Sequence, residues 1–188
     1  MGLISRRKSR EAALRALYQC EIGGSSLAEA LEDSLAGAQL EPDLDAFARR
    51  LATGVSTRIQ EIDAKIDPVL NEYALDRVAA IDRNVLRIAV YELWFEPDVP
   101  PAVSINEAID IAKKYSTAES GKFVNGILGR LVQESPKADW TPPMETEQEQ
   151  PELETPEQVP EEVVEAGSAE MEHLQKIGGW KLRDEDMA

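Results

Sequence analysis

The chain has very few of the residues on which metal binding and nucleophilic catalysis depend. Its 188 residues include one cysteine, Cys20, and one histidine, His173. A lone cysteine cannot form an intramolecular disulfide, and these two residues cannot supply a zinc cluster or a Ser-His or Cys-His catalytic pair to a core that ends before residue 137. We therefore expect no metal, no cofactor and no catalytic residue, and a reducing compartment suits the single thiol.

Long apolar segments are absent as well. No run approaches the roughly 20 apolar residues that a helix needs to span a bilayer, and no signal-type apolar stretch follows the basic residues near the N-terminus. These absences argue against a membrane protein, and we expect the chain to be soluble and cytoplasmic. No segment alternates apolar and polar residues convincingly, so we predict no strands.

The acidity of the chain is concentrated near its C-terminus. The formal net charge is −16. Residues 1–136 contain 16 Lys and Arg and 21 Asp and Glu, whereas residues 137–188 contain 4 and 15. The second segment also holds five of the 11 prolines and few large apolar residues, so its burial cannot offset the entropy of ordering it. We predict a folded domain over 1–136 and a disordered acidic tail over 137–188.

Apolar residues recur at helical spacing through much of the first 136 residues. From Leu44 to Ile66 they are three or four positions apart, which predicts one long helix that begins near Pro42. In residues 81–95 they cover most of the helical circumference, which is typical of a helix in the middle of a bundle. Further helices are predicted over residues 5–21, 27–37, 104–115 and 119–132.

Local signals set several of these boundaries. Ser26 with Glu29, and Ser104 with Glu107, have the spacing of capping boxes, so we expect each serine to precede the first turn of its helix. Pro136 closes the last helix. The predicted fold is therefore an all-α domain of about six or seven helices with short connections.

Five basic residues among the first twenty need an explanation, because the chain as a whole is acidic. They are Arg6, Arg7, Lys8, Arg10 and Arg15, with Glu11 as the acid among them. Cations at the start of a helix oppose the helix dipole, so they do not stabilise this helix. On a helical projection Arg6 and Arg10 lie above its apolar face. Contact with phosphate groups and a solvated helix end both explain the cluster, and the pattern alone does not decide between them.

Four segments of the chain together resemble the NusB family of transcription antitermination factors. They are RRKSREAALRALYQ from Arg6, IDRNVLRIAVYEL from Ile81, SINEAIDIAKKY from Ser104 and KFVNGILGRL from Lys122. Their order and spacing agree with the family over residues 5–133, which is nearly the whole predicted domain. The resemblance implies an all-helical domain of two three-helix halves, in agreement with the helices predicted above.

The family resemblance also implies a function. NusB proteins pair with NusE, which is ribosomal protein S-ten, and the pair binds the boxA element of nascent RNA. The complex joins the elongating RNA polymerase with other Nus factors and supports antitermination, chiefly in ribosomal RNA operons. The resemblance therefore implies an adaptor that is not an enzyme. Some family members form homodimers and others are monomers, so a homodimer is left open for this chain.

Particular residues acquire roles through the same resemblance. It places RNA contacts at the basic helix start and at the start of the last helix, and contacts with NusE at or near Tyr18 and Asp82. The RNA positions are Arg6, Arg7, Lys8, Arg10, Glu119, Lys122 and Phe123. Arginine supplies paired donors for phosphate, and an exposed Phe123 can stack on an unpaired base.

Each of three positions also has a purely structural explanation. The helical spacing of Phe123 with Ile127 and Leu131 suits a core aromatic residue. Tyr18 lies at the edge of the apolar face of its helix, where a boundary tyrosine is common. Asp82 is an acid at the start of a helix, which the helix dipole favours.

The chain departs from the family in its acidic tail and, in a minor way, at Ser116 and Gly129. The tail acts either as a solubilising appendage or as a phosphate mimic that folds back on the basic residues. A second reading of the whole chain is a relative of the ribosomal RNA cytosine methyltransferases, whose N-terminal domain is similar to NusB. Residues after the core contain no Gly-rich loop for a methyl donor and no cysteine, which disfavours that reading.

Overall fold

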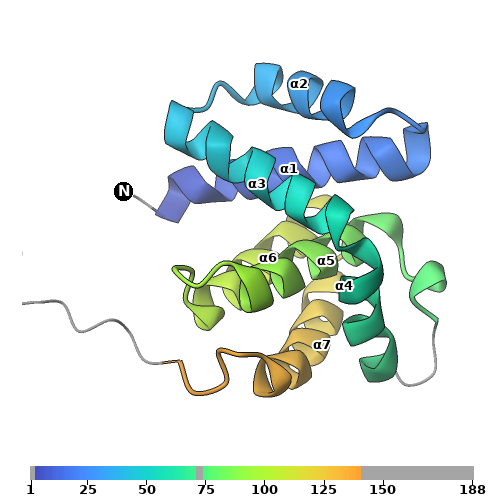
Figure 1. Cartoon of the computed structure of the whole chain (residues 1–188). Coiled ribbons are helices and arrows are strands. Elements are labelled where there is room, and N and C mark those ends of the chain that lie inside the picture. Colours follow the sequence, from blue (N-terminus) through green and yellow to red (C-terminus); the bar gives the residue numbers. More distant parts are fainter. Residues whose placement is uncertain (1–2, 71–73, 141–188) are drawn as a thin grey trace, which may run out of the picture. The chain divides into compact units, whose positions relative to one another are not determined.

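The computed structural model of the chain describes residues 3–70 and 74–140, and these residues form helices and connections without a strand. The prediction of an all-α fold is confirmed (Figure 1). The α-helices are α1 (Leu3–Gly23), α2 (Leu27–Ala38), α3 (Pro42–Thr57), α4 (Ile59–Ile66), α5 (Ala80–Phe95), α6 (Pro101–Tyr115) and α7 (Ser120–Glu134). Two short 3-10 helices, η1 (Asp67–Val69) and η2 (Leu75–Arg77), connect α4 to α5.

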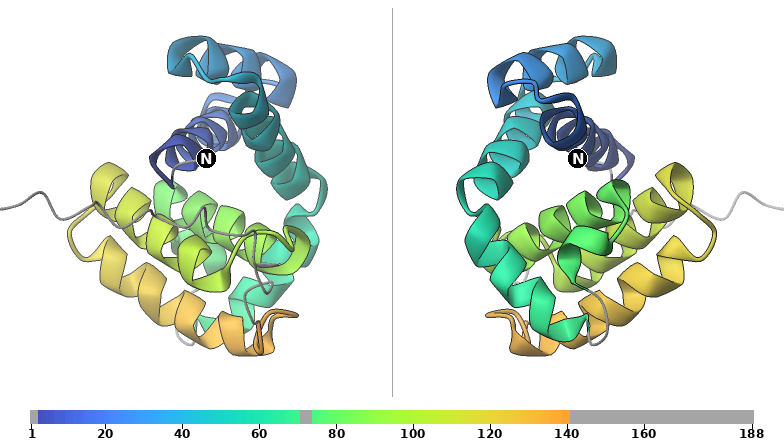
Figure 2. Two further views of the ribbon diagram at one scale, coloured as in Figure 1. Left: turned by 90° about the vertical axis from the view of Figure 1, so that its left-hand side faces the viewer. Right: turned by 90° about the vertical axis from the view of Figure 1, so that its right-hand side faces the viewer.

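The helices pack in two groups, as the family resemblance implied. In the first group α1 contacts both α2 and α3, and in the second α5, α6 and α7 contact one another, with α4 against α5 (Figures 1 and 2). Contacts of α1 and α3 with α5 join the groups. The side chains of both groups form one hydrophobic core.

Helix α5 lies in the middle of this core. Every residue from Asn84 to Leu93 is buried, which confirms the prediction from its continuous apolar circumference. A helix that is buried on all sides must satisfy its polar side chains internally. Those polar side chains, described below, connect α5 to α1, α4 and α7.

The predicted single helix over residues 44–66 is wrong, because the chain turns at Arg58 between α3 and α4. Arg58 has φ −115° and ψ 19°, and its N–H donates to the carbonyls of Gly54 and Val55 at 3.2 Å each. The apolar spacing continues across this turn, so periodicity alone could not reveal it. Ile59, a member of the predicted stripe, is 37% exposed, whereas Ile62 is fully buried. The turn thus directs α4 into the second group.

The two predicted capping boxes have different outcomes. Ser26 forms one, because its Oγ accepts from the backbone N–H of Glu29 at 3.3 Å and its own N–H donates to the Glu29 carboxylate at 3.2 Å. At Ser104 the prediction is wrong, since α6 begins three residues earlier, at Pro101. The fixed φ of proline suits the first position of a helix. Ser104 therefore lies inside α6, and its side chain is buried.

Lys137 packs on the helical domain although the predicted tail begins with it. Its Nζ donates to the backbone carbonyl of Glu92 at 2.8 Å, to that of Val99 at 2.6 Å and also to that of Glu96. A cation at these carbonyls stabilises the C-terminal end of α5. Contacts of the helical domain therefore extend past Pro136. Residues 141–188 of the predicted tail lie outside the described residues, so their predicted disorder stays a prediction.

We predict that Gly54→Ala destabilises the fold. The ring of Tyr91 lies directly against Gly54, so a Cβ atom there would overlap the ring. Tyr91 is buried and packs on Phe95 with ring centroids 5.3 Å apart, which leaves it little room to move. Such overpacking lowers the free energy of unfolding by about 1–3 kcal/mol, measured by urea denaturation.

Gly126→Ala is the matched control. No atom lies within 4 Å of the Cβ position of Gly126, which is also inside a helix. Alanine there should leave stability unchanged or raise it by about 0.5–1 kcal/mol. Equal effects of the two substitutions would contradict the proposed contact of Tyr91 with α3.

Candidate nucleic-acid interface

The basic side chains at the start of α1 point in different directions. Lys8 is exposed, and Arg6 is half-buried with its guanidinium 5.5 Å from the ring centroid of Phe47. Neither of these two cations forms an ion pair with another described residue. Both are therefore available to an anionic ligand.

Arg7 is at the surface but is held by two carboxylates of α6. Its Nε and Nη2 donate to Glu107 at 2.9 and 2.8 Å, and Nη2 also donates to Asp110 at 2.8 Å. The hydrogen bonds with Glu107 raise the pKa of Arg7 above its usual range, so it stays charged. Three of the five N–H donors of the guanidinium are used in this way, which leaves the two on Nη1. Arg7 thus presents a fixed pair of donors.

Arg10 is buried between the two helix groups, with 2% of its surface exposed. Its Nε and Nη2 donate to the carboxylate of Glu92 on α5 at 2.7 and 3.1 Å, and the ring of Phe47 lies 5.5 Å away. Glu92 is 1% exposed, so each charge depends on the other. The structure therefore separates Arg10 from the other four cations of its cluster, which are exposed or half-buried, and gives it a structural environment.

The residues predicted on α7 lie at its start. Glu119 occupies the position before the first residue of α7 and accepts hydrogen bonds from the Lys122 ammonium at 3.1 and 3.2 Å. Both are largely exposed. Phe123 is half-buried and packs against the core.

Helix α6 connects these two sets of residues. Its Glu107 contacts Arg7, and about two turns later its Lys114 donates to Glu11 of α1 at 2.8 Å. The chain then turns into α7, so the start of α7 follows directly from the end of α6 that contacts α1. The N-terminal cations and the start of α7 are in this way both fixed relative to α6.

Asp82 is buried beneath the start of α7. One of its carboxylate oxygens accepts from the Ser120 hydroxyl at 2.9 Å, and Ser120 is also bonded to Thr117 and Ser116. The other oxygen has no hydrogen-bond partner within the part of the chain that the structure describes. With 7% of its surface exposed, Asp82 is placed to position α7 more than to face a partner directly.

Tyr18 lies on an exposed apolar surface near the end of α1. Ile22, one turn later on the same face, is the most exposed large apolar residue of the described chain at 58%, and Tyr18 is 38% exposed. Ile22 is not among the residues predicted from the sequence, although its position four residues after Tyr18 places both on one face of the helix.

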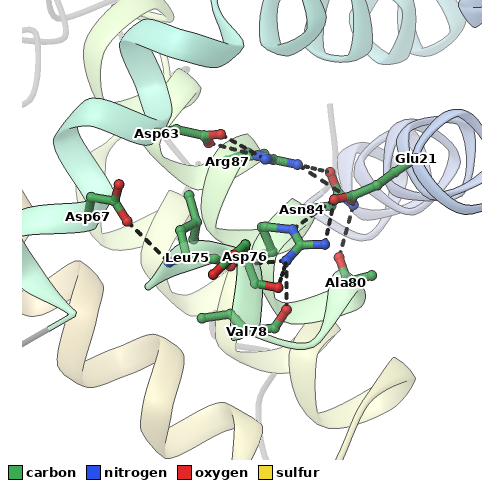
Figure 3. A network of polar contacts seen from close by, with 10 residues as sticks. Glu21, Asp63, Asp67, Leu75, Asp76, Val78, Ala80, Asn84 and Arg87 are labelled. Carbon is green, nitrogen blue, oxygen red and sulfur yellow. Dashed lines mark hydrogen bonds and ion pairs between the residues drawn. The ribbon is translucent and has the colours of Figure 1, made fainter. Parts of the chain in front are cut away.

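A network of polar side chains fixes this end of α1 (Figure 3). Glu21 accepts from Arg83 at 2.8 Å and from the amide of Asn84 at 2.6 Å, both on α5. On the same helix, Arg87 donates twice to Asp63 of α4 at 2.8 Å. The surface that carries Tyr18 is therefore rigidly connected to α5.

The described residues contain no group of three or more His, Cys, Asp or Glu side chains that could hold a metal ion. No described helix has the length and apolar character to cross a membrane.

These features define an all-helical protein of two packed helix groups, with surface cations at the start of its first helix. The family model described as "NusB family" matches residues 7–133. A relative named "Transcription antitermination protein NusB", from Myxococcus xanthus (strain DK1622), is 45% identical over 132 residues, which cover 68% of this chain and 94% of that protein. The chain belongs to the NusB family of transcription antitermination proteins.

Solved structures agree with this assignment. A structure of T. maritima NusB has 44% sequence identity with this chain and a TM-score of 0.67. The match covers 71% of this chain and 94% of that protein's chain. A second structure holds antitermination factors NusB and NusE in complex with dsRNA; the matched chain is 28% identical, with coverage of 70% and 98% and a TM-score of 0.64. The resemblance stated from the sequence is confirmed, and the methyltransferase reading is not favoured.

We predict that Arg10→Ala acts on stability. Removing the guanidinium leaves the buried Glu92 carboxylate without its partner, which should lower the free energy of unfolding by about 3–5 kcal/mol. Lys8→Ala, two residues away and exposed, should change it by less than about 0.5 kcal/mol. Chemical denaturation of both variants measures the difference, and an Arg10→Ala protein as stable as Lys8→Ala would contradict the role of the buried pair.

Proposed function

We propose that this chain is a transcription antitermination factor that binds boxA-type RNA together with NusE, ribosomal protein S-ten, and supports processive transcription of ribosomal RNA operons. The observation that carries the proposal is its likeness, over 70% of the chain, to NusB in the structure of NusB and NusE with dsRNA. The surface cations of α1 supply the chemistry that RNA binding requires.

The proposed RNA surface combines the starts of α1 and α7. Arg6, Arg7 and Lys8 bind phosphates, with Arg7 using the two donors that Glu107 and Asp110 leave free. On α7, Lys122 adds a cation held by Glu119, and Phe123 offers its ring for stacking. Arg10 supports this surface by fixing α1 on α5.

The proposed NusE surface lies at the other end of α1. Tyr18 and Ile22 provide exposed apolar area, which is the usual centre of a protein interface. Asp82 contributes through the position of α7, because its carboxylate bonds to Ser120. The start of α7 is therefore close to this end of α1, because Arg83, the residue after Asp82, bonds to Glu21. The proposed partner surface thus adjoins the α7 part of the proposed RNA surface.

In this role the chain acts as an adaptor in the cytoplasm. It joins the RNA polymerase elongation complex with other Nus factors and catalyses no reaction itself. Its contribution to antitermination is then one of assembly: affinity for RNA depends on NusE, and the complex rather than the single chain recognises boxA.

We predict that Arg6→Ala combined with Lys8→Ala weakens binding to a boxA RNA in the presence of NusE. Each lost phosphate contact should flatten the slope of log K against log salt by about 0.7, the value for single strands. Fluorescence anisotropy at several salt concentrations measures both quantities. Arg77→Ala removes an exposed cation elsewhere and should change little. An unchanged salt slope in the double variant would reject these two residues, and equal affinity for scrambled RNA would reject boxA recognition.

Removal of residues 141–188 tests the acidic tail. This truncation keeps Lys137, whose ammonium bonds to the end of α5, and deletes 14 acidic residues. A solubilising appendage predicts unchanged affinity for boxA RNA and lower solubility, measured by anisotropy and by precipitation. Tighter RNA binding at low salt would instead support the alternative, in which the tail competes with phosphate.

A further inference from the structure

A second group of hydrogen-bond donors lines a groove between α3 and α5. The groove has a volume of about 530 Å³, and its polar lining consists of Arg49, Arg50, Arg58, Thr53, Thr57 and Tyr91. No carboxylate of the described chain is part of this lining. Guanidinium and hydroxyl groups are the lining expected of an anion site, and carboxylates outside the lining pair with two of the three arginines.

The three arginines differ in whether they form ion pairs with carboxylates. Arg58 is exposed, lies 4.9 Å from the ring centroid of Phe95, and forms no ion pair with a described residue. Arg50 is 55% exposed and donates to Glu96 at 3.1 Å. Arg49 is held by carboxylates of α2 and α3. Arg58 is therefore the cation most available to a ligand.

The floor of the groove is the ring of Tyr91. It can lie against α3 because residue 54 is glycine, where a Cβ would overlap the ring. Burial raises the pKa of Tyr91, so its hydroxyl stays protonated and can donate. The hydroxyl of Thr57 is directed back to the carbonyl of Thr53 at 2.8 Å, which leaves it as an acceptor. Thr53 and Tyr91 are thus the neutral donors of the groove.

This groove continues the basic surface at the start of α1. Arg6 and Arg50 both lie over the ring of Phe47, 5.5 and 5.3 Å from its centroid, so the two guanidinium carbons are at most about 11 Å apart. A few nucleotides of a single strand can span that distance. Arg50 and Arg58 both line the groove, so a path from Arg6 through Arg50 to Arg58 carries three cations, with the Glu96 carboxylate beside Arg50.

We propose that the groove between α3 and α5 binds backbone phosphates of the nucleotides that flank the boxA element. This inference rests on the proposed function, since it extends the same RNA beyond the surface formed by α1 and α7. Arginine forks and hydroxyl donors bind phosphate without reading the base, so the groove should favour longer RNA over shorter RNA irrespective of the flanking sequence.

The test compares a bare boxA RNA with RNAs that carry flanking nucleotides on the 5′ or the 3′ side, each with the full chain and NusE. Arg58→Ala should weaken binding of one flanked RNA by about 3- to 10-fold and flatten its salt slope by about 0.7, without changing affinity for the bare element. Arg58→Glu should weaken it further. Arg77→Ala is the matched control, because it removes an exposed arginine outside the groove.

Amide NMR signals of Thr53 and Thr57 provide a second measurement. They should shift on addition of the flanked RNA and stay in place with the bare element. One result would overturn the proposal for the groove and leave the proposed function intact. In that result, both Arg58 variants bind every RNA with wild-type affinity, while Arg6→Ala weakens binding of all of them. Failure of the wild-type chain to prefer boxA over scrambled RNA would instead reject the proposed function.

A competing ligand is an acidic peptide. A synthetic peptide of residues 145–175, which contains 11 acids and no Lys or Arg, supplies that chemistry. Shifts of Thr53 and Thr57 with this peptide but not with the flanked RNA would assign the groove to acidic protein segments and overturn the proposal.

Discussion

The buried ion pair between Arg10 and Glu92 is the interaction on which the arrangement of the surfaces depends. It joins α1 to α5, and a charge this deeply buried is stable only with its partner in place. One turn before Arg10, Arg7 meets the carboxylates of α6. The pair therefore fixes the rotation of α1, and that rotation leaves Lys8 exposed while Arg6 lies over Phe47.

Cations at the start of a helix oppose its dipole, and the structure shows how this chain offsets that effect. Arg7 and Arg10 are both paired with carboxylates from other helices, whereas Arg6 and Lys8 form no ion pair with a described residue. The cluster thus contains paired and unpaired cations, which the sequence pattern does not separate. A guanidinium that is already held, like that of Arg7, also loses less conformational entropy when it binds phosphate.

Much of the fold follows from local patterns, and the failures have identifiable causes. The all-round apolar sequence of α5 predicted its central position, and Ser26 capped α2 as expected. The break at Arg58 was not predicted, because the apolar spacing continues through it. The position of Arg10 above the apolar face hinted at burial, but Glu92 lies 82 residues away, and no spacing rule connects them. Long-range pairs of this kind decide which cations remain at the surface.

The polar residues of the buried α5 explain how the two proposed binding surfaces keep their positions relative to each other. Near its start, Asp82 bonds to Ser120 and so positions α7, while Arg83 and Asn84 hold the end of α1 through Glu21. Immediately after its last residue, the Glu96 carboxylate orients Arg50 in the groove, and the Glu96 carbonyl accepts from Lys137. Apolar side chains could have stabilised this helix equally well, since buried charges are often neutral or unfavourable for stability. Apolar side chains could not have fixed the directions of side chains on four neighbouring segments. We therefore interpret the polar content of α5 as the means by which the proposed RNA and partner surfaces are held relative to each other.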